Sequence, residues 1–220
     1  MRTIQVTGKG LLILKPDTTR ITMTLTGLYG DYAETLRRSS EKTETLRELF
    51  ARFGFERTEL KTIGFDVETE YESYRDKDGD YRQRFAGYRF NHTAKLEFPS
   101  DDERLGRILY ALSNSPAEAE FRISYTVKDP EAAKTLLLEK AVADAKAKAE
   151  VLTRAGGAAL GQIKSIDYSR VEIDFECRPM NRTLMAKADC AVAGEGSYAL
   201  GIEPDDIEVS DTVTIVWEIE

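Results

Sequence analysis

The chain has 220 residues, 41% hydrophobic and 32% charged, a balance typical of a folded globular protein rather than a disordered one. A net charge of −8 argues against broad nucleic-acid binding, because neutralising phosphates requires a clustered basic surface. No stretch approaches the roughly 20 apolar residues of a membrane span, and the N-terminal segment does not read as a signal peptide. As written, the sequence therefore predicts a cytoplasmic protein.

The first elements are strands at 3–14 and 18–28, where apolar and polar residues alternate. A long helix is expected next, with Asp31 as its N-cap, Glu34 completing a capping-box pattern and Gly54 as a stop. One stripe at helical spacing is expected to face the core: Tyr32, Leu36, Ser39, Thr43, Leu46, Phe50 and Phe53.

Two strands near 58–71 and 81–98 follow, and the Asp78-Gly79 pair between them predicts a hairpin with a type I′ turn. Aspartates in the same segment resemble a calcium loop. The glycine and the final glutamate that an EF-hand needs are absent at the required spacing, which excludes that motif.

A second helix is expected from a Ser-x-x-Glu cap at Ser100 to a point before Pro116, followed by a strand at 120–127. Asp129 and Pro130 then introduce an alanine-rich helix that runs to about Ala155.

The last part of the chain holds strands near 162–174 and 206–219, separated by a segment without periodicity at 175–204. A long segment of this kind is typical of a functional or mobile loop. The element order is ββαββαβαβ-loop-β. It predicts an α+β fold, with helices covering a largely antiparallel sheet in a single domain over residues 1–220.

Most apparent chemical motifs have simpler explanations. Gly156, Gly157 and Gly161 follow a helix C-terminus, where the dipole disfavours phosphate, so they are interpreted as a cap and turn. The sole histidine, His92, lies within a strand and is expected to pack there, since no nucleophile and orienting acid accompany it. The two cysteines, Cys177 and Cys190, are expected to be reduced. We expect no metal, no cofactor and no enzymatic activity.

The alanine-rich helix carries an apolar stripe whose middle is built of small side chains: Leu138, Ala141, Val142, Ala145, Ala149 and Leu152. Small residues let a neighbouring backbone approach closely, so the helix is expected to lie tightly on the sheet or on a helix of another subunit. Its charged residues are spaced to form i,i+4 ion pairs on the solvent-exposed face of the helix.

The order of elements and several motifs together resemble the SIMPL-domain family of bacterial proteins, over almost the whole chain. Four regions carry the resemblance: the first strand and its turn, Leu60-Lys61-Thr62 after the first long helix, the strand near residue 90, and the alanine-rich helix with its Leu-Gly turn. The other residues concerned are Gly8, Gly10, Pro16, Asp17, Gly87, Tyr88, Asn91, Ala141, Ala145, Ala149, Leu152, Leu160 and Gly161.

This resemblance implies an α+β protein that forms ring-like homo-oligomers, has no established enzymatic activity and is linked to envelope integrity and stress tolerance. Many family members are periplasmic or secreted. The leading hypothesis is therefore a non-enzymatic, self-associating protein whose interface uses strand edges and residues 175–204.

Two alternatives stay open. A small-ligand sensor or enzyme would use the Tyr- and Arg-rich strand pair at 71–90, where Tyr74, Arg82 and Arg84 supply stacking and bidentate contacts. A protein-interaction module would instead order residues 175–204 on a partner, whose identity the sequence does not reveal.

Overall fold

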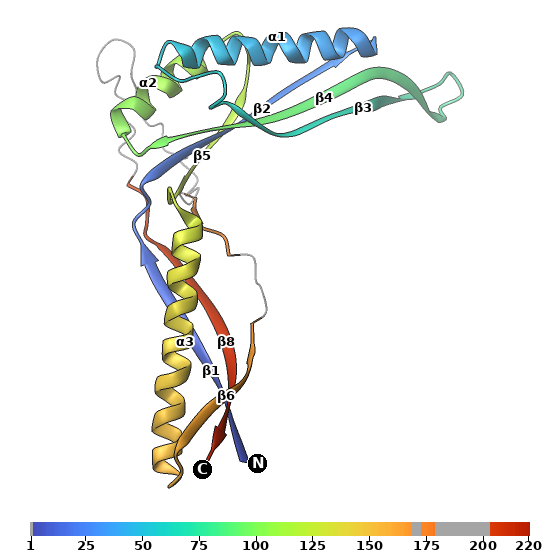
Figure 1. Ribbon diagram of the computed structural model, residues 1–220. Coiled ribbons are helices and arrows are strands. Elements are labelled where there is room, and N and C mark those ends of the chain that lie inside the picture. The colour runs from blue at the N-terminus through green and yellow to red at the C-terminus, as the bar shows by residue number, and fades with distance from the viewer. Residues whose placement is uncertain (1, 169–172, 179–202) are drawn as a thin grey trace. The chain divides into compact units, whose positions relative to one another are not determined.

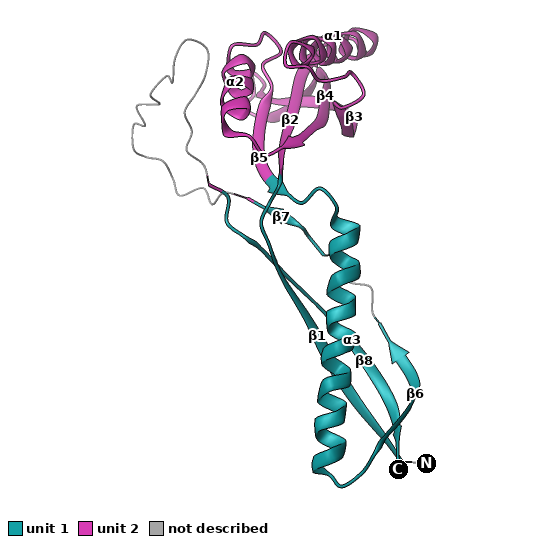
Figure 2. Cartoon of the chain, turned by 60° about the vertical axis from the view of Figure 1, so that its left-hand side comes forward, with its two compact units in different colours: residues 1–17, 125–177, 204–220 teal, residues 18–124, 178–203 magenta. Residues whose placement is uncertain are grey.

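The computed structural model describes residues 2–168, 173–178 and 203–220. It confirms the α+β class and the antiparallel pairing of the strands, and the predicted order of the long elements is also found. The chain divides into two compact units (Figure 2). Unit 1 comprises residues 1–17, 125–177 and 204–220, and unit 2 comprises residues 18–124 and 178–203. Each unit is described by itself.

Unit 1 is a three-stranded antiparallel sheet covered by one long helix (Figure 1). The strands are β1 (Arg2–Leu14), β8 (Ile207–Ile219) and β6 (Leu160–Asp167), in the order β1-β8-β6, and the helix is α3 (Pro130–Ala155). The five apolar residues that alternate along β8 are buried as the sequence predicts: Ile207, Val209, Val213, Ile215 and Trp217. They form the floor on which α3 packs.

Unit 2 contains the other sheet and two helices. Its strands are β2 (Thr18–Tyr29), β3 (Lys61–Arg75), β4 (Tyr81–Pro99) and β5 (Glu120–Thr126), in the order β3-β4-β2-β5; the last two residues of β5 belong to unit 1. The helices α1 (Tyr32–Ala51) and α2 (Asp102–Ser113) contribute to one core. Its largest fully buried side chains include Ile21, Met23, Leu46, Phe50 and Phe90.

The three helices of the described residues each begin at an aspartate whose carboxylate accepts a backbone N–H of the first turn, as N-caps do. Asp31 caps α1 and Asp129 caps α3, as predicted. The prediction for α2 was wrong by one residue, because Asp101 accepts from the Arg104 amide while the Ser100 hydroxyl lies near Thr19. An ionised carboxylate at this position also interacts favourably with the helix dipole.

The stripe predicted for α1 is correct at its C-terminal half only. Ser39, Thr43, Leu46 and Phe50 are buried, but Leu36 is exposed and Thr35 is buried in its place. The Thr35 hydroxyl donates to the Asp31 carbonyl, so its polar group is satisfied within the helix although the residue is buried.

The prediction of a type I′ turn at Asp78-Gly79 is also wrong. Among the described residues with positive φ only Gly79 belongs to this turn, with φ of 88°, so only one of the two central positions has the required sign. Instead the Asp76 carboxylate accepts the amides of Asp78 and Asp80, and the Gly79 amide donates to the Asp76 carbonyl. The hairpin is thus closed by a side chain that caps a wider turn.

The predicted loop at 175–204 contains the two-residue strand β7 (Glu176–Cys177), which pairs with Tyr125 and Thr126 of β5 in unit 1. Residues 179–202, with Cys190 among them, lie outside the described residues. The Cys177 thiol is free and half-buried.

Candidate functional site

The family-motif glycines of β1 lie directly under helix α3. A Cβ on Gly8 would fall 2.7 Å from the Ala145 Cβ and still closer to the Ala141 carbonyl oxygen, and one on Gly10 would overlap the Leu137 carbonyl. Ala141, Ala145 and Ala149 are fully buried. Glycine on the strand and alanine on the helix therefore let two backbones meet, and the small-residue stripe is used within the chain, on the sheet. We call this contact the β1–α3 seam.

A carboxylate of the helix closes the edge of the seam. Asp144 accepts the Lys9 amide at 2.7 Å and the Lys148 ammonium at 2.6 Å. The Lys148 contact, followed by the Lys9 amide, lowers the pKa of the Asp144 carboxyl. Of the ion pairs predicted along α3, this one is present, and it also ties the helix to β1.

The C-terminal end of α3 is capped by glycine, as the sequence predicts. Gly157 has a φ of 70°, its amide donates to the Arg154 carbonyl, and the next amide donates to Thr153. This is the hydrogen-bond pattern of a Schellman motif. The prediction that Leu152 faces the core was wrong, because Leu152 is exposed and Thr153 is buried instead.

An open groove borders the Leu-Gly turn that follows α3. It has a volume of about 560 Å³ and is lined by α3, β6 and β8, with Leu160, Gly161 and Trp217 among its residues. A Cβ on Gly161 would lie 2.9 Å from the Glu218 carbonyl oxygen, so this glycine also permits a close backbone approach.

The Pro16-Asp17 turn is held by hydrogen bonds to the chain just before α3. The Asp17 carboxylate accepts the Lys128 amide at 2.7 Å, and the Asp17 amide donates to the Thr126 carbonyl. Pro16 is half-buried beside it. These contacts give the Pro-Asp motif a structural role in unit 1.

The β4 motif residues surround a bulge in the β3–β4 pair. The register shifts between Glu70 and Tyr71, and Gly87 has a φ of 148° where a Cβ would collide with the Tyr29 carbonyl. Asn91 is exposed on the same strand. The bulge changes which side chains share a face beyond it.

Beyond that bulge the hairpin continues past the first residue of α1 (Figure 1), and we call residues 71–85 the arm. One face of the arm is aromatic. The Tyr71 and Phe85 rings are 6.0 Å apart, Phe85 and Tyr88 are 5.2 Å apart, and Tyr88 reaches Tyr32 at 5.4 Å. All three pairs are edge-to-face. Tyr71, Phe85 and Tyr32 are each about half exposed.

The opposite face of the arm holds the residues predicted to bind a ligand. Tyr74 pairs with Arg82 across the strands, and the Arg84 guanidinium lies 5.7 Å from the Tyr74 ring. Arg82 donates to Asp76, however, and Arg84 donates to Glu72. The structure brings the three residues together but compensates both positive charges, which weakens the attraction for an anionic ligand.

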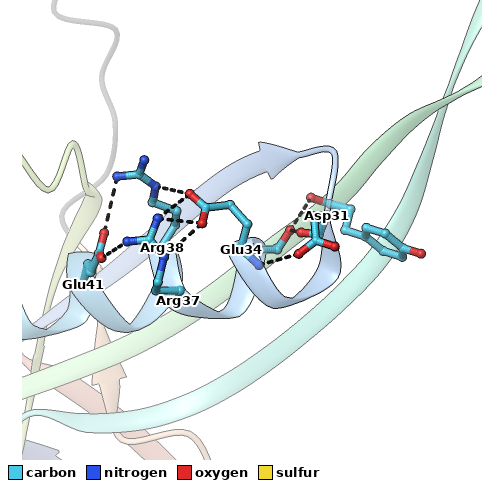
Figure 3. Close-up of polar contacts among 7 residues, drawn as sticks. Asp31, Glu34, Arg37, Arg38 and Glu41 are labelled. Carbon is cyan, nitrogen blue, oxygen red and sulfur yellow. Dashed lines mark hydrogen bonds and ion pairs between the residues drawn. The ribbon is translucent and has the colours of Figure 1, made fainter.

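The first turns of α1 hold an ion-pair network on the exposed surface (Figure 3). Arg37 and Arg38 both donate to Glu34, and both reach Glu41. Hydrogen bonds from Arg37 and then Arg38 lower the pKa of the Glu34 carboxyl. Glu34 therefore pairs with both arginines, and their positive charges do not form an uncompensated basic patch.

His92 is buried on β4 between two threonines. Thr43 donates its hydroxyl proton to the Ser39 carbonyl at 2.8 Å, so its oxygen is left to accept from His92 Nδ1 at 2.9 Å. His92 Nε2 then accepts from the Thr62 hydroxyl at 2.8 Å. This assignment describes a neutral imidazole held in one tautomer. Both ring nitrogens are hydrogen-bonded within the fold, so His92 has a structural role, in agreement with the sequence interpretation.

The pKa of His92 is expected to lie below its ordinary value of 6.5, because burial and then the charge of Arg47 disfavour the imidazolium. The unfolded chain binds a proton that the folded chain does not, so folding stability should fall as the pH drops below about 6.5 towards the folded pKa. NMR titration of the single imidazole measures this directly. A midpoint at or above 6.5 would contradict the structure, and His92→Gln should flatten that part of the pH dependence.

The described residues meet neither the requirements of a metal site nor those of a membrane-spanning helix. No three His, Cys, Asp or Glu residues among them lie close enough to hold a metal ion. None of the helices there is long and apolar enough to cross a bilayer.

Two curated proteins are similar to this chain. The 26 kDa periplasmic immunogenic proteins of Brucella abortus and Brucella melitensis are each 25% identical over 205 residues, which cover 90% of this chain and 82% of the relative. The profile of the SIMPL family, described as a protein of unknown function (DUF541), matches residues 4–217. The match spans both units and includes the β1–α3 seam and the β4 bulge. The chain therefore belongs to the SIMPL family.

Proposed function

We propose that this protein is a non-enzymatic, self-associating member of its family, and that copies of the chain bind one another through the aromatic face of the arm. The observation that carries the proposal is the row of exposed rings from Tyr71 to Tyr32. Aromatic side chains are enriched in the centres of protein interfaces, and contiguous exposed apolar surface marks interaction sites.

The edge of the sheet supports the same proposal. β3 ends the strand order β3-β4-β2-β5, so its outer side pairs with no other strand among the described residues. An unpaired strand edge offers a row of backbone donors and acceptors to a second chain. A strand added to this edge would extend the sheet, and its own side chains would lie beside the rings of the aromatic face.

The location proposed for this assembly is the bacterial envelope. Both curated relatives are named periplasmic proteins, which supports an envelope location over the cytoplasmic one expected from the sequence. The family resemblance adds envelope integrity and stress tolerance as the setting. Fractionation of cells expressing the natural gene, with the protein found in the periplasmic extract, is the expected result.

Self-association is tested by light scattering and sedimentation velocity at micromolar concentrations. The wild type is expected to exceed the 24.8 kDa of one chain, and the double variant Tyr71→Thr/Phe85→Thr to return to that mass. Threonine keeps strand propensity while removing the rings.

The matched control changes the other face of the same arm. Tyr74→Thr/Arg84→Thr removes one aromatic and one charged residue of that face, and is expected to leave the assembly unchanged. A wild type that is strictly monomeric would overturn the proposal of self-association. Equal loss of mass in both double variants would overturn the choice of the aromatic face.

A further inference from the structure

A small cavity that is open to solvent lies in unit 2 between helix α1 and strands β3 and β4. It has a volume of about 220 Å³ and combines polar with apolar walls. The polar lining residues are Ser39, Ser40, Thr43, Arg47 and His92, and the apolar ones are Leu36 and Phe65. The α1 residues follow helical spacing, so they present one continuous face to the cavity.

Arg47 brings a positive charge that the protein compensates only in part. Its guanidinium is 3.6 Å from Glu44, but Glu44 is bound by two nitrogens of Arg57, its principal partner. The Nε of Arg47 is buried and has no hydrogen-bond partner within the described structure. The Arg47 side chain as a whole is 34% exposed and lines the cavity, so its incompletely compensated charge is available to an anion there.

The other polar groups determine which acceptor fits. His92 is neutral and both its nitrogens are already used by Thr43 and Thr62, so it adds neither charge nor a free donor. The hydroxyls of Ser39 and Ser40 are the remaining donors that line the cavity. One cation and two hydroxyls suit a single negative charge on few oxygen atoms.

We propose that this cavity binds a small monocarboxylate with a short apolar tail. Its carboxylate would pair with the Arg47 guanidinium, which matches planar carboxylates, and with a serine hydroxyl. The tail would lie between Leu36 and Phe65. The volume corresponds to about seven water-sized groups, which accommodates a ligand of the size of butyrate. Inorganic phosphate, with more oxygens and more charge, matches the cavity less well.

The single histidine makes the site directly observable, since His92 lines the cavity and gives the only imidazole signals of the chain. Titration of the protein with butyrate is expected to shift those signals to saturation. Butyramide, which has the same shape without the charge, is expected to cause no saturable shift. A shift that never saturates, or an equal response to butyramide, would overturn the proposal.

Variants locate the ligand within the cavity. Arg47→Gln is expected to weaken butyrate binding about tenfold or more, the loss expected for a hydrogen bond to a charged group. Arg47→Lys keeps the charge but not the planar guanidinium, so its affinity for butyrate should lie between those of Arg47→Gln and the wild type. Arg52→Gln, at the end of the same helix and outside the cavity, should bind like the wild type.

Two further outcomes would count against the proposal. Unchanged affinity in an Arg47→Gln variant that keeps the wild-type circular dichroism would show that the carboxylate binds elsewhere. Phosphate binding more tightly than butyrate would replace the monocarboxylate with a general anion. Neither result depends on the assembly state, which the arm variants test separately.

Discussion

Replacing Gly8 with alanine is expected to destabilise unit 1 by about 3 kcal/mol or more, the upper range for forced overpacking. The added Cβ would fall within 2.7 Å of the Ala145 Cβ and closer still to backbone atoms of α3. Backbone atoms of a helix cannot rotate away as a side chain can. The helix must separate from β1, and the seam and its buried alanines lose their contacts.

The measurement is denaturant unfolding followed by Trp217 fluorescence. Trp217 is the only tryptophan in the sequence and packs in the same core cluster as Ala141 and Ala145, so it reports unit 1. The comparison is Gly64→Ala on β3 in unit 2, followed by the His92 imidazole signals of that unit, where the new Cβ would meet only Thr93 at 3.9 Å. That change should be neutral or stabilising, because alanine restricts the unfolded chain. Equal unfolding midpoints for Gly8→Ala and wild type would refute the close packing of the seam.

Replacing Leu46 with alanine is expected to destabilise unit 2 by about 2–5 kcal/mol. Leu46 is 0% exposed and sits in the core cluster beneath α1, so its loss removes buried apolar surface and leaves a cavity. The loss of the native His92 imidazole signals during unfolding reports unit 2, since that residue lies on β4 and is the only histidine.

Leu36→Ala provides the comparison on the same helix. Leu36 is 37% exposed, so the same substitution is expected to cost less than about 1 kcal/mol. The sequence pattern predicts both leucines to be buried, whereas the structure separates them. Similar losses of stability at the two positions would favour the sequence pattern over the structure.

The candidate site was predictable in unequal parts. The small side chains of α3 indicated close packing from the sequence, and α3 does pack closely. The partner of that packing was not identified, because β1 lies more than 120 residues earlier in the chain. Tyr74, Arg82 and Arg84 were correctly grouped, but their compensation by Asp76 and Glu72 depends on the hairpin register.

The cavity beside Arg47 was missed altogether. Its residues come from α1, β3 and β4, and no spacing in the sequence connects Arg47 with Phe65 or His92. The only available signal was the run of small polar residues on α1, Ser39, Ser40 and Thr43, on a helix face that otherwise carries large apolar side chains.

By itself the sequence determined the α+β class, the order of the long elements, the caps at Asp31 and Asp129, and the family. These depend on local propensities and on periodicities that operate over a few residues. Only the tertiary structure decided that the alanine stripe of α3 packs on the glycines of β1, that the arm has one aromatic and one charged face, and that Arg47 borders a cavity. Each depends on register and on contacts between distant segments, where a shift of one residue exchanges the two faces of a strand.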